Sequence, residues 1–174
     1  MFCYQCEETV KGTGCTIKGV CGKDDEIAAY HDVLVYLCKG LSLRNLAAMK
    51  NGKGDPSAGL FIADALFSTL TNVNFDKARF SGMIHRAVEI RDRLPATGIT
   101  EPDACTWKPA GEADILEKAK TVGILATEDE DIRSLRSTLL FGLKGMSAYY
   151  THAAILGKTD TAITGFIQKG LASM

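Results

Sequence analysis

The chain has 174 residues, of which 46% are hydrophobic and 24% charged, and its formal net charge is −1. This hydrophobic fraction is sufficient for a folded core and argues against global disorder. Because Lys and Arg are scattered and the net charge is near zero, we expect no nucleic-acid partner, which would require a basic face. No apolar stretch approaches the length of a membrane span, so we also expect no membrane partner.

Residues 1–23 form a cysteine-rich segment. Four of the six cysteines follow the pattern C-x2-C-x8-C-x5-C there, at Cys3, Cys6, Cys15 and Cys21. The segment lacks the basic start and apolar run of a signal peptide, so we expect a cytoplasmic protein, in which clustered cysteines are more often metal ligands than disulfides. Glycines between the cysteines permit sharp turns, and we predict a loop wrapped around a metal centre.

The cysteine spacing favours an iron–sulfur cluster over zinc. Structural zinc sites usually contain two tight C-x2-C pairs, whereas only Cys3 and Cys6 form such a pair here. Unequal spacing in a compact loop suits a cluster, because its iron atoms lie further apart than the ligands of a single ion. Zinc remains the main alternative, followed by disulfides or plain thiols.

Residues that flank the cysteines are candidates for the surroundings of the centre. Lys11, Lys18 and Lys23 lie close by in sequence and would balance the negative charge of a cluster. Gly14 and Gly22 would let backbone N–H groups approach its sulfide atoms. The alternative reading is that these lysines are solvated loop residues.

Residues 24–94 show the three- and four-residue periodicity of helices. We predict a three-helix bundle with helices at residues 25–50, 56–72 and 76–93. Asp55 and Pro56 mark the second start, as an N-cap followed by a proline that needs no N–H partner. Cys38 falls on the apolar face of the first helix and reads as a core residue.

Residues 95–126 form a connection that contains three of the four prolines. We predict a short helix at 112–120 and an extended segment at 121–126. Cys105 reads as a loop thiol without a partner.

Residues 127–174 form a second helical unit. We predict helices at 130–156 and 161–173. Thr127 and Glu130 form a T-x-x-E capping box at the start of the first of them.

The two units match each other at an offset of 105 positions without a gap. Identical pairs include Leu34/Leu139, Lys39/Lys144, Gly40/Gly145, Gly52/Gly157, Asp55/Asp160 and Ile62/Ile167. Amphipathic periodicity alone does not account for the match, because the helix end and the next cap coincide as well. We therefore predict an all-α fold of two tandem three-helix units behind the cysteine loop.

The second unit is predicted to lack its third helix, which would fall beyond Met174. Two amphipathic helices leave an apolar groove that a third normally covers. We therefore expect an exposed apolar surface on this unit and a chain that is a piece of a longer protein. Another chain, or the short helix at 112–120, is the alternative cover.

Several stretches resemble the N-terminal region of the hybrid cluster (prismane) protein family, whose members are hydroxylamine reductases. They are the opening MFCYQCEET, the following GTGC and GVCGK, and ATEDEDIRSLRSTLLFGLKGMSAYYTHAAILGK. The resemblance covers essentially the whole chain. It implies a helical first domain of two three-helix bundles and a 4Fe–4S cluster bound by Cys3, Cys6, Cys15 and Cys21.

Family members are much longer, and the resemblance places their catalytic hybrid 4Fe–2S–2O cluster on residues of later domains that this chain lacks. The expected function is therefore electron transfer from a reductase or ferredoxin-type donor to that cluster, which reduces hydroxylamine to ammonia, or nitric oxide. This chain alone is expected to be inactive. The implied partners are the donor, the remaining domains and a second copy in a homodimer. The alternative function is a zinc-stabilised helical interaction module without a redox role.

Overall fold

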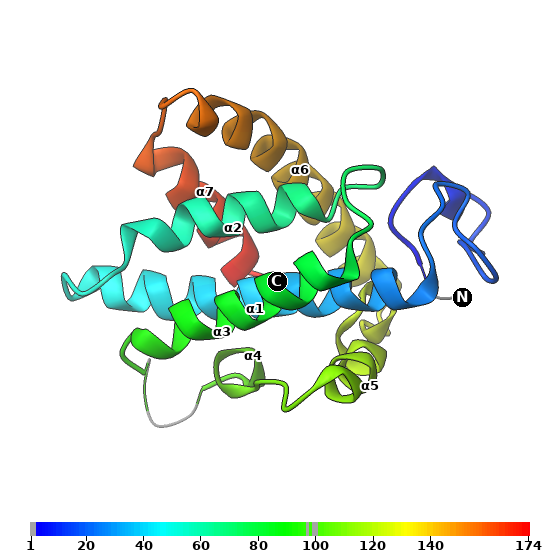
Figure 1. Ribbon diagram of the computed structural model, residues 1–174, viewed down its shortest axis with the longest axis horizontal. Helices are drawn as coiled ribbons and strands as arrows, with labels where there is room; N and C mark the ends of the chain where they lie inside the picture. Colours follow the sequence, from blue (N-terminus) through cyan, green and yellow to red (C-terminus); the bar gives the residue numbers. More distant parts are fainter. Residues whose placement is uncertain (1–2, 97, 99–100) are drawn as a thin grey trace.

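A computed structural model of the chain describes residues 3–96, 98 and 101–174 (Figure 1). Every regular element in these ranges is a helix, apart from one isolated β-bridge in the N-terminal loop. In chain order the elements are η1 (Glu7–Thr9), α1 (Asp25–Lys50), α2 (Pro56–Ser68), α3 (Lys77–Arg93), α4 (Asp103–Thr106), α5 (Glu112–Val122), η2 (Ile124–Ala126), α6 (Glu130–Ile155) and α7 (Thr161–Ala172). The predicted all-α fold is therefore confirmed.

Helix α1 lies in the middle of the molecule, in contact with α2, α3, α4, α5 and α7 (Figure 1). Asp24 caps its start by accepting a hydrogen bond from the Ile27 backbone N–H at 2.8 Å. Tyr30, Leu34 and Cys38 are completely buried. A helix that is apolar around most of its circumference is expected to lie inside a domain, and the predicted core role of Cys38 is confirmed.

Helix α2 ends four residues earlier than the predicted end at 72. The hydroxyl of Ser68 donates to the Ala65 carbonyl at 2.7 Å, and that of Thr69 donates to the Leu66 carbonyl at 2.8 Å. Such side chains satisfy the last carbonyl groups of a helix and favour its end at this point.

The predicted extended segment at 121–126 is wrong. Helix α5 continues to Val122, and a single 3₁₀ turn follows it. The reason is packing, because Ile115, Leu116, Ala119 and Val122 recur at helical spacing and all contact the core.

The start of α6 is also different from the predicted capping box at Thr127. The cap is Asp129, whose carboxylate accepts a hydrogen bond from the Ile132 backbone N–H at 2.9 Å. Asp and Thr are both good N-caps, so two candidates this close in sequence cannot be separated by residue type alone.

The predicted repeat is present in the local structure of the helix pairs α1–α2 and α6–α7. Both connections contain a glycine with positive φ, 67° at Gly52 and 74° at Gly157. The next residue closes the same hydrogen bond in each, from Lys53 N–H to the Ala48 carbonyl and from Lys158 N–H to the Ala153 carbonyl, both at 2.9 Å. Asp55 and Asp160 then cap α2 and α7.

Equivalent positions of the two units have different surroundings. Ile27 of α1 is 5% exposed, whereas its counterpart Ile132 of α6 is 47% exposed. Tyr30 is completely buried, whereas its counterpart Leu135 is 71% exposed. Helix α3 packs along α1, and α5 also lies against α1 rather than covering α6. The expected exposed apolar surface of the second unit is therefore present, and the helix at 112–120 packs mainly on α1.

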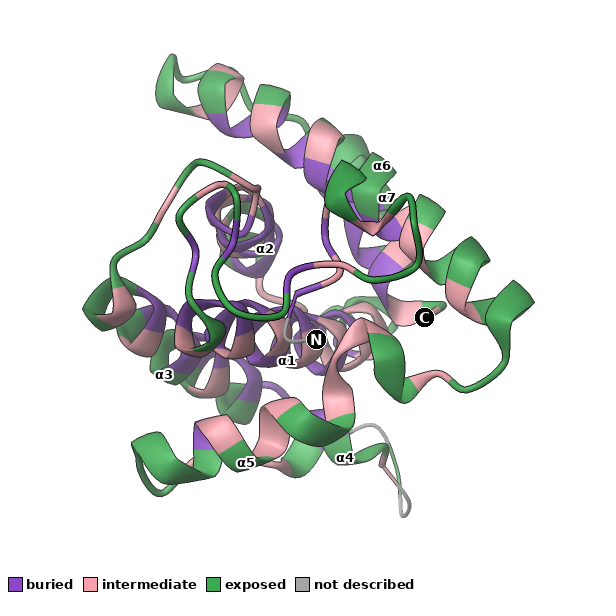
Figure 2. Cartoon of the chain, turned by 90° about the vertical axis from the view of Figure 1, so that its right-hand side faces the viewer, coloured by how far each residue is buried: buried purple, intermediate pink, exposed green. Residues whose placement is uncertain are grey.

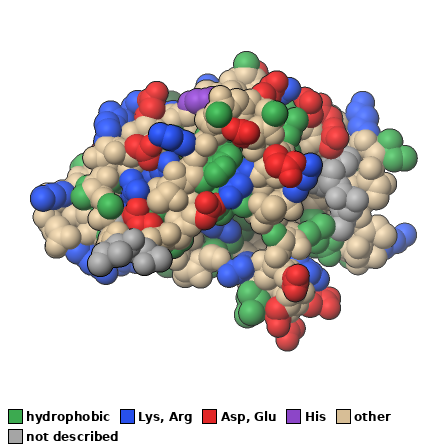
Figure 3. All heavy atoms as spheres, turned by 90° about the horizontal axis from the view of Figure 1, so that it is seen from below, with side chains coloured by type: hydrophobic (Ala, Val, Ile, Leu, Met, Phe, Trp, Pro, Cys, Tyr) green, Lys and Arg blue, Asp and Glu red, His purple; other side chains and the backbone are tan. Residues whose placement is uncertain are grey.

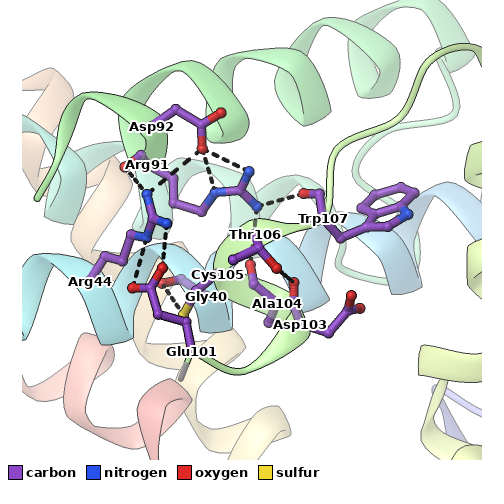
Figure 4. A network of polar contacts seen from close by, with 10 residues as sticks. All are labelled: Gly40, Arg44, Arg91, Asp92, Glu101, Asp103, Ala104, Cys105, Thr106 and Trp107. Carbon is purple, nitrogen blue, oxygen red and sulfur yellow. Dashed lines mark hydrogen bonds and ion pairs between the residues drawn. The ribbon is translucent and has the colours of Figure 1, made fainter. Parts of the chain in front are cut away.

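A network of polar contacts fixes the segment around α4 to α1 and α3 (Figure 4). The buried guanidinium of Arg91 donates to the carbonyl groups of Ala104 at 3.1 Å and Trp107 at 2.6 Å. A Cβ atom on Gly40 would lie 1.8 Å from the Ala104 carbonyl oxygen, so only glycine allows this approach. The prediction of a loop thiol without a partner is wrong for Cys105, because it is buried in α4 and its Sγ donates to the Gly40 carbonyl at 3.6 Å.

On the face drawn in Figure 3, Lys and Arg side chains are interspersed with Asp and Glu. Among the helices of the described residues, none is long and apolar enough to cross a membrane.

Candidate metal centre

The cysteine loop lies at the N-terminal end of α1 (Figure 1). Figure 2, which faces this end of the molecule, shows it alternating between buried and exposed stretches. The Cys15 backbone N–H donates to the Cys3 carbonyl at 3.2 Å, which brings the middle of the loop back to its start. A second turn is closed by Gly22 N–H to the Gly19 carbonyl at 2.8 Å. The loop therefore doubles back twice within a short length of chain.

The four cysteines divide into two pairs by burial. Cys3 and Cys15 are buried against Ala28 of α1, and Cys6 and Cys21 are half-buried nearer the surface. All four are free thiols. Within the described ranges, no three His, Cys, Asp or Glu side chains lie close enough together to hold a metal ion. The structure thus brings Cys3 and Cys15 together directly and places the other two on the same loop.

The residues predicted around the cysteines have unequal positions. Lys11 and Lys18 are exposed. Gly14 and Gly22 have positive φ, 56° and 94°, so their role in the structure is to form the turns of the loop. Gly19 lies close to a candidate ligand, because a Cβ there would lie 3.2 Å from Cys21 Sγ.

Lys23 is the one lysine of the loop that is buried, at 1% exposure. Its Nζ donates to Gln5 Oε1 at 3.2 Å and lies 3.2 Å from His31 Nδ1. Since an ammonium group can only donate, Nδ1 is the acceptor and the imidazole proton lies on Nε2. Gln5 Nε2 in turn donates to Asp32 Oδ1 at 3.2 Å. A buried polar network therefore ties the cysteine loop to α1.

A second buried lysine reaches the same network from α6. Lys144 is 2% exposed, and its Nζ donates to the Thr69 carbonyl at 3.3 Å. Burial, reinforced by the nearby charge of Lys23, lowers the pKa of Lys144 to about 8. Burial between the two lysines lowers the pKa of His31 to about 2, so the imidazole is neutral. Burial also raises the pKa of Asp32 to about 6, although Lys144 and the Gln5 amide oppose this.

The network carries an excess of positive charge. Two buried ammonium groups face a single carboxylate, Asp32, and no ion pair within 4 Å joins Lys23 or Lys144 to a carboxylate among the residues that the structure describes. A buried charge is costly unless an opposite charge compensates it. We expect the compensating anion among the cysteines. Burial raises the pKa of the Cys3 thiol, and the charge of Lys23 is the main effect that lowers it.

A tetrathiolate metal centre meets this requirement. Four thiolates bring more negative charge than either a 4Fe–4S core or one Zn²⁺ ion neutralises, so the centre is an anion. The donor set and the buried lysines of this chain therefore fit such a group. The sequence indicated Lys23 by its position beside Cys21, but the part played by Lys144 depends on how α6 packs and has no local signal.

Comparison with known proteins gives the same family over the whole chain. Residues 1–174 match the Prismane/CO dehydrogenase family. The chain is 46% identical to a hydroxylamine reductase of Desulfitobacterium hafniense, over 99% of this chain and 33% of that protein. The values are 46%, 100% and 32% for the hydroxylamine reductase of Bacteroides fragilis, and 44%, 99% and 34% for that of Nitratidesulfovibrio vulgaris. The chain spans about a third of the length of these relatives. On this evidence of similarity along its entire length, the chain belongs to the Prismane/CO dehydrogenase family.

Proposed function

We propose that this chain is an electron-transfer domain that holds a 4Fe–4S cluster through Cys3, Cys6, Cys15 and Cys21. The observation that carries the proposal is the excess of buried positive charge beside the cysteines, where Lys23 of the loop and Lys144 of α6 face a single carboxylate, Asp32. A 4Fe–4S cluster, when bound, accepts and donates one electron at a time. The names of the relatives support a redox role, because each is a hydroxylamine reductase.

The residues of the loop would have different roles in such a domain. Cys3 and Cys15 attach the centre to the helices from within, since both are buried against α1. Cys6 and Cys21 hold its outer side, where they are half-buried and closer to an approaching donor. Lys23 and the Gln5 amide keep the loop in place on His31 and Asp32.

In the proposed reaction, the electrons pass on to a hybrid iron–sulfur–oxygen cluster in further domains of a cytoplasmic hydroxylamine reductase. Reduction of hydroxylamine to ammonia and water consumes two electrons and two protons, so a one-electron relay must deliver twice per turnover. A reductase or ferredoxin-type protein is the proposed donor. A zinc-stabilised helical module without redox function is the second candidate. One Zn²⁺ ion held by four thiolates is also an anion, so it would compensate the charge of the same buried lysines.

The test is the visible spectrum of the chain purified without oxygen. We expect absorption near about 400 nm that bleaches on addition of dithionite, which is typical of an iron–sulfur centre. A colourless protein that contains zinc would instead establish the structural module and overturn the redox proposal.

Ligand variants make the test specific to the loop. Cys15→Ser should remove most of the visible absorption, because it replaces a thiolate ligand by a poor one. Cys38→Ala is the matched control, since Cys38 is a buried thiol that belongs to the helical core. Equal loss of absorption in both variants would mean that the cysteines act through folding rather than as ligands.

A further inference from the structure

We propose that Lys144 of α6 sets the reduction potential of the metal centre, by supplying a buried positive charge that favours its reduced form. This inference rests on the proposed function. It gives the second helical unit a part in the redox site although that unit contributes no cysteine to the loop.

The position of Lys144 is fixed from several sides. Its Nζ donates to the Thr69 carbonyl at the end of α2, at 3.3 Å. The charged and titratable groups that face it are Lys23 and Cys3 of the loop and His31 and Asp32 of α1. Because the side chain is 2% exposed, water and salt screen its charge much less than they would at the surface.

No carboxylate within ion-pair distance neutralises the charge of Lys144 among the described residues. Asp32 is the carboxylate that acts on it, and Asp32 also interacts with Lys23, Lys39 and the Gln5 amide. His31 contributes no charge, because its burial keeps the imidazole neutral. Lys144 lines the same cavity as Gln5, which stands between Cys3 and Cys6 in the loop, and Cys3 is among the groups on which its charge acts.

The direction of the effect follows from the charge change on reduction. An added electron makes the tetrathiolate centre more negative by one unit, and its attraction to Lys144 increases accordingly. Buried positive charge near a cluster therefore stabilises the reduced form and raises the reduction potential. Removal of that charge should shift the potential to a more negative value.

The internal repeat supplies a matched control at Lys39, the α1 counterpart of Lys144. Both side chains line the same cavity of about 520 Å³ between α1 and α6, and both interact with Asp32. The other charge that acts on Lys39 is Arg136, not the cysteine loop. Lys39 thus shares the residue type and the cavity but not the interaction with Cys3.

The experiment is a redox titration of the metal-loaded chain in its original form and as Lys144→Met, Lys39→Met and Lys144→Arg, each at equal iron content. We expect Lys144→Met to shift the midpoint potential to a more negative value, Lys39→Met to leave it unchanged, and Lys144→Arg to restore it. An unchanged potential in Lys144→Met, or an equal shift in Lys39→Met, would overturn the inference.

Two further outcomes are informative. If folded Lys144→Met loses its iron while Lys39→Met and Lys144→Arg retain it, the charge is required to bind the centre, and the inference that it sets the potential of a bound centre is overturned. If the original chain binds no iron, the proposed function itself fails, and this result is distinct from a failure of the inference about Lys144.

Discussion

At the scale of single residues, two glycines at equivalent positions of the repeat have opposite roles. A Cβ on Gly40 would collide with the Ala104 backbone, whereas nothing lies within 4 Å of a Cβ on Gly145. Gly40 therefore allows a close contact between α1 and the α4 segment, whereas Gly145 of α6 makes no such contact. A shared position in the repeat therefore does not imply a shared contact.

Alanine substitutions at these two positions should have opposite effects on stability. Gly40→Ala should lower the free energy of unfolding by more than about 2 kcal/mol, because the α4 backbone must move to accommodate the new atom. Gly145→Ala should raise it by about 0.5–1 kcal/mol, the usual gain from alanine inside a helix. Urea denaturation of both variants measures the difference, and a comparable loss in both would contradict the close contact at Gly40.

At the scale of the helices, the exposed apolar surface of α6 distinguishes it from α1. Ile27→Ala should lower the free energy of unfolding by about 2–4 kcal/mol, because it empties a fully packed site. Ile132→Ala, the same substitution at the equivalent position, should cost less than about 1 kcal/mol, since that side chain is half-exposed. Denaturation of the two variants side by side tests this, and equal losses would mean that Ile132 packs as tightly as Ile27.

The helices follow from local signals to the extent that those signals are unambiguous. The predicted starts of α1, α2 and α7 are confirmed, because each begins after an aspartate that caps it. The helical state of 121–122 was missed, because a short apolar run is compatible with either a strand or the last turn of a helix until its contacts are known. The same holds for α4, whose place depends on the backbone contact with Gly40 and not on its own four residues.

Only the cysteines and the lysine beside them could be predicted from the sequence of the candidate site. The spacing of the cysteines predicts a metal-binding loop, and Lys23 stands two residues after the last of them. The convergence of Gln5, Asp32 and Lys144 depends on how α1 and α6 pack against the loop, so no pattern along the chain contains it.

At the scale of the whole molecule, Lys144 of α6 contacts the end of α2 and interacts with the cysteine loop. Its charge should affect the stability of the metal-free chain. The pKa of Lys144 falls from 10.5 to about 8 on folding. Between these pH values the unfolded chain binds more protons than the folded one, so stability decreases as the pH falls through this range. The lowered pKa of Lys144 therefore decreases the free energy of unfolding by about 3 kcal/mol once the pH is below 8.

Comparison with Lys144→Met isolates this contribution. The variant should be more stable than the original metal-free chain at pH 7, and this difference should shrink as the pH rises from 8 to 10.5. Cys3 and Asp32 are present in both proteins, so the difference between the two unfolding curves reports the titration of Lys144 together with its effect on these two groups. A difference that stays constant across this pH range would show that Lys144 is not held at a lowered pKa.

The central claim is that the cysteine loop holds an iron–sulfur cluster rather than a single metal ion. The most direct measurement is the content of iron, acid-labile sulfide and zinc in the chain purified without oxygen. The account predicts about four irons and about four sulfides per chain, all lost in Cys15→Ser and retained in Cys38→Ala. About one zinc per chain with no labile sulfide would contradict it.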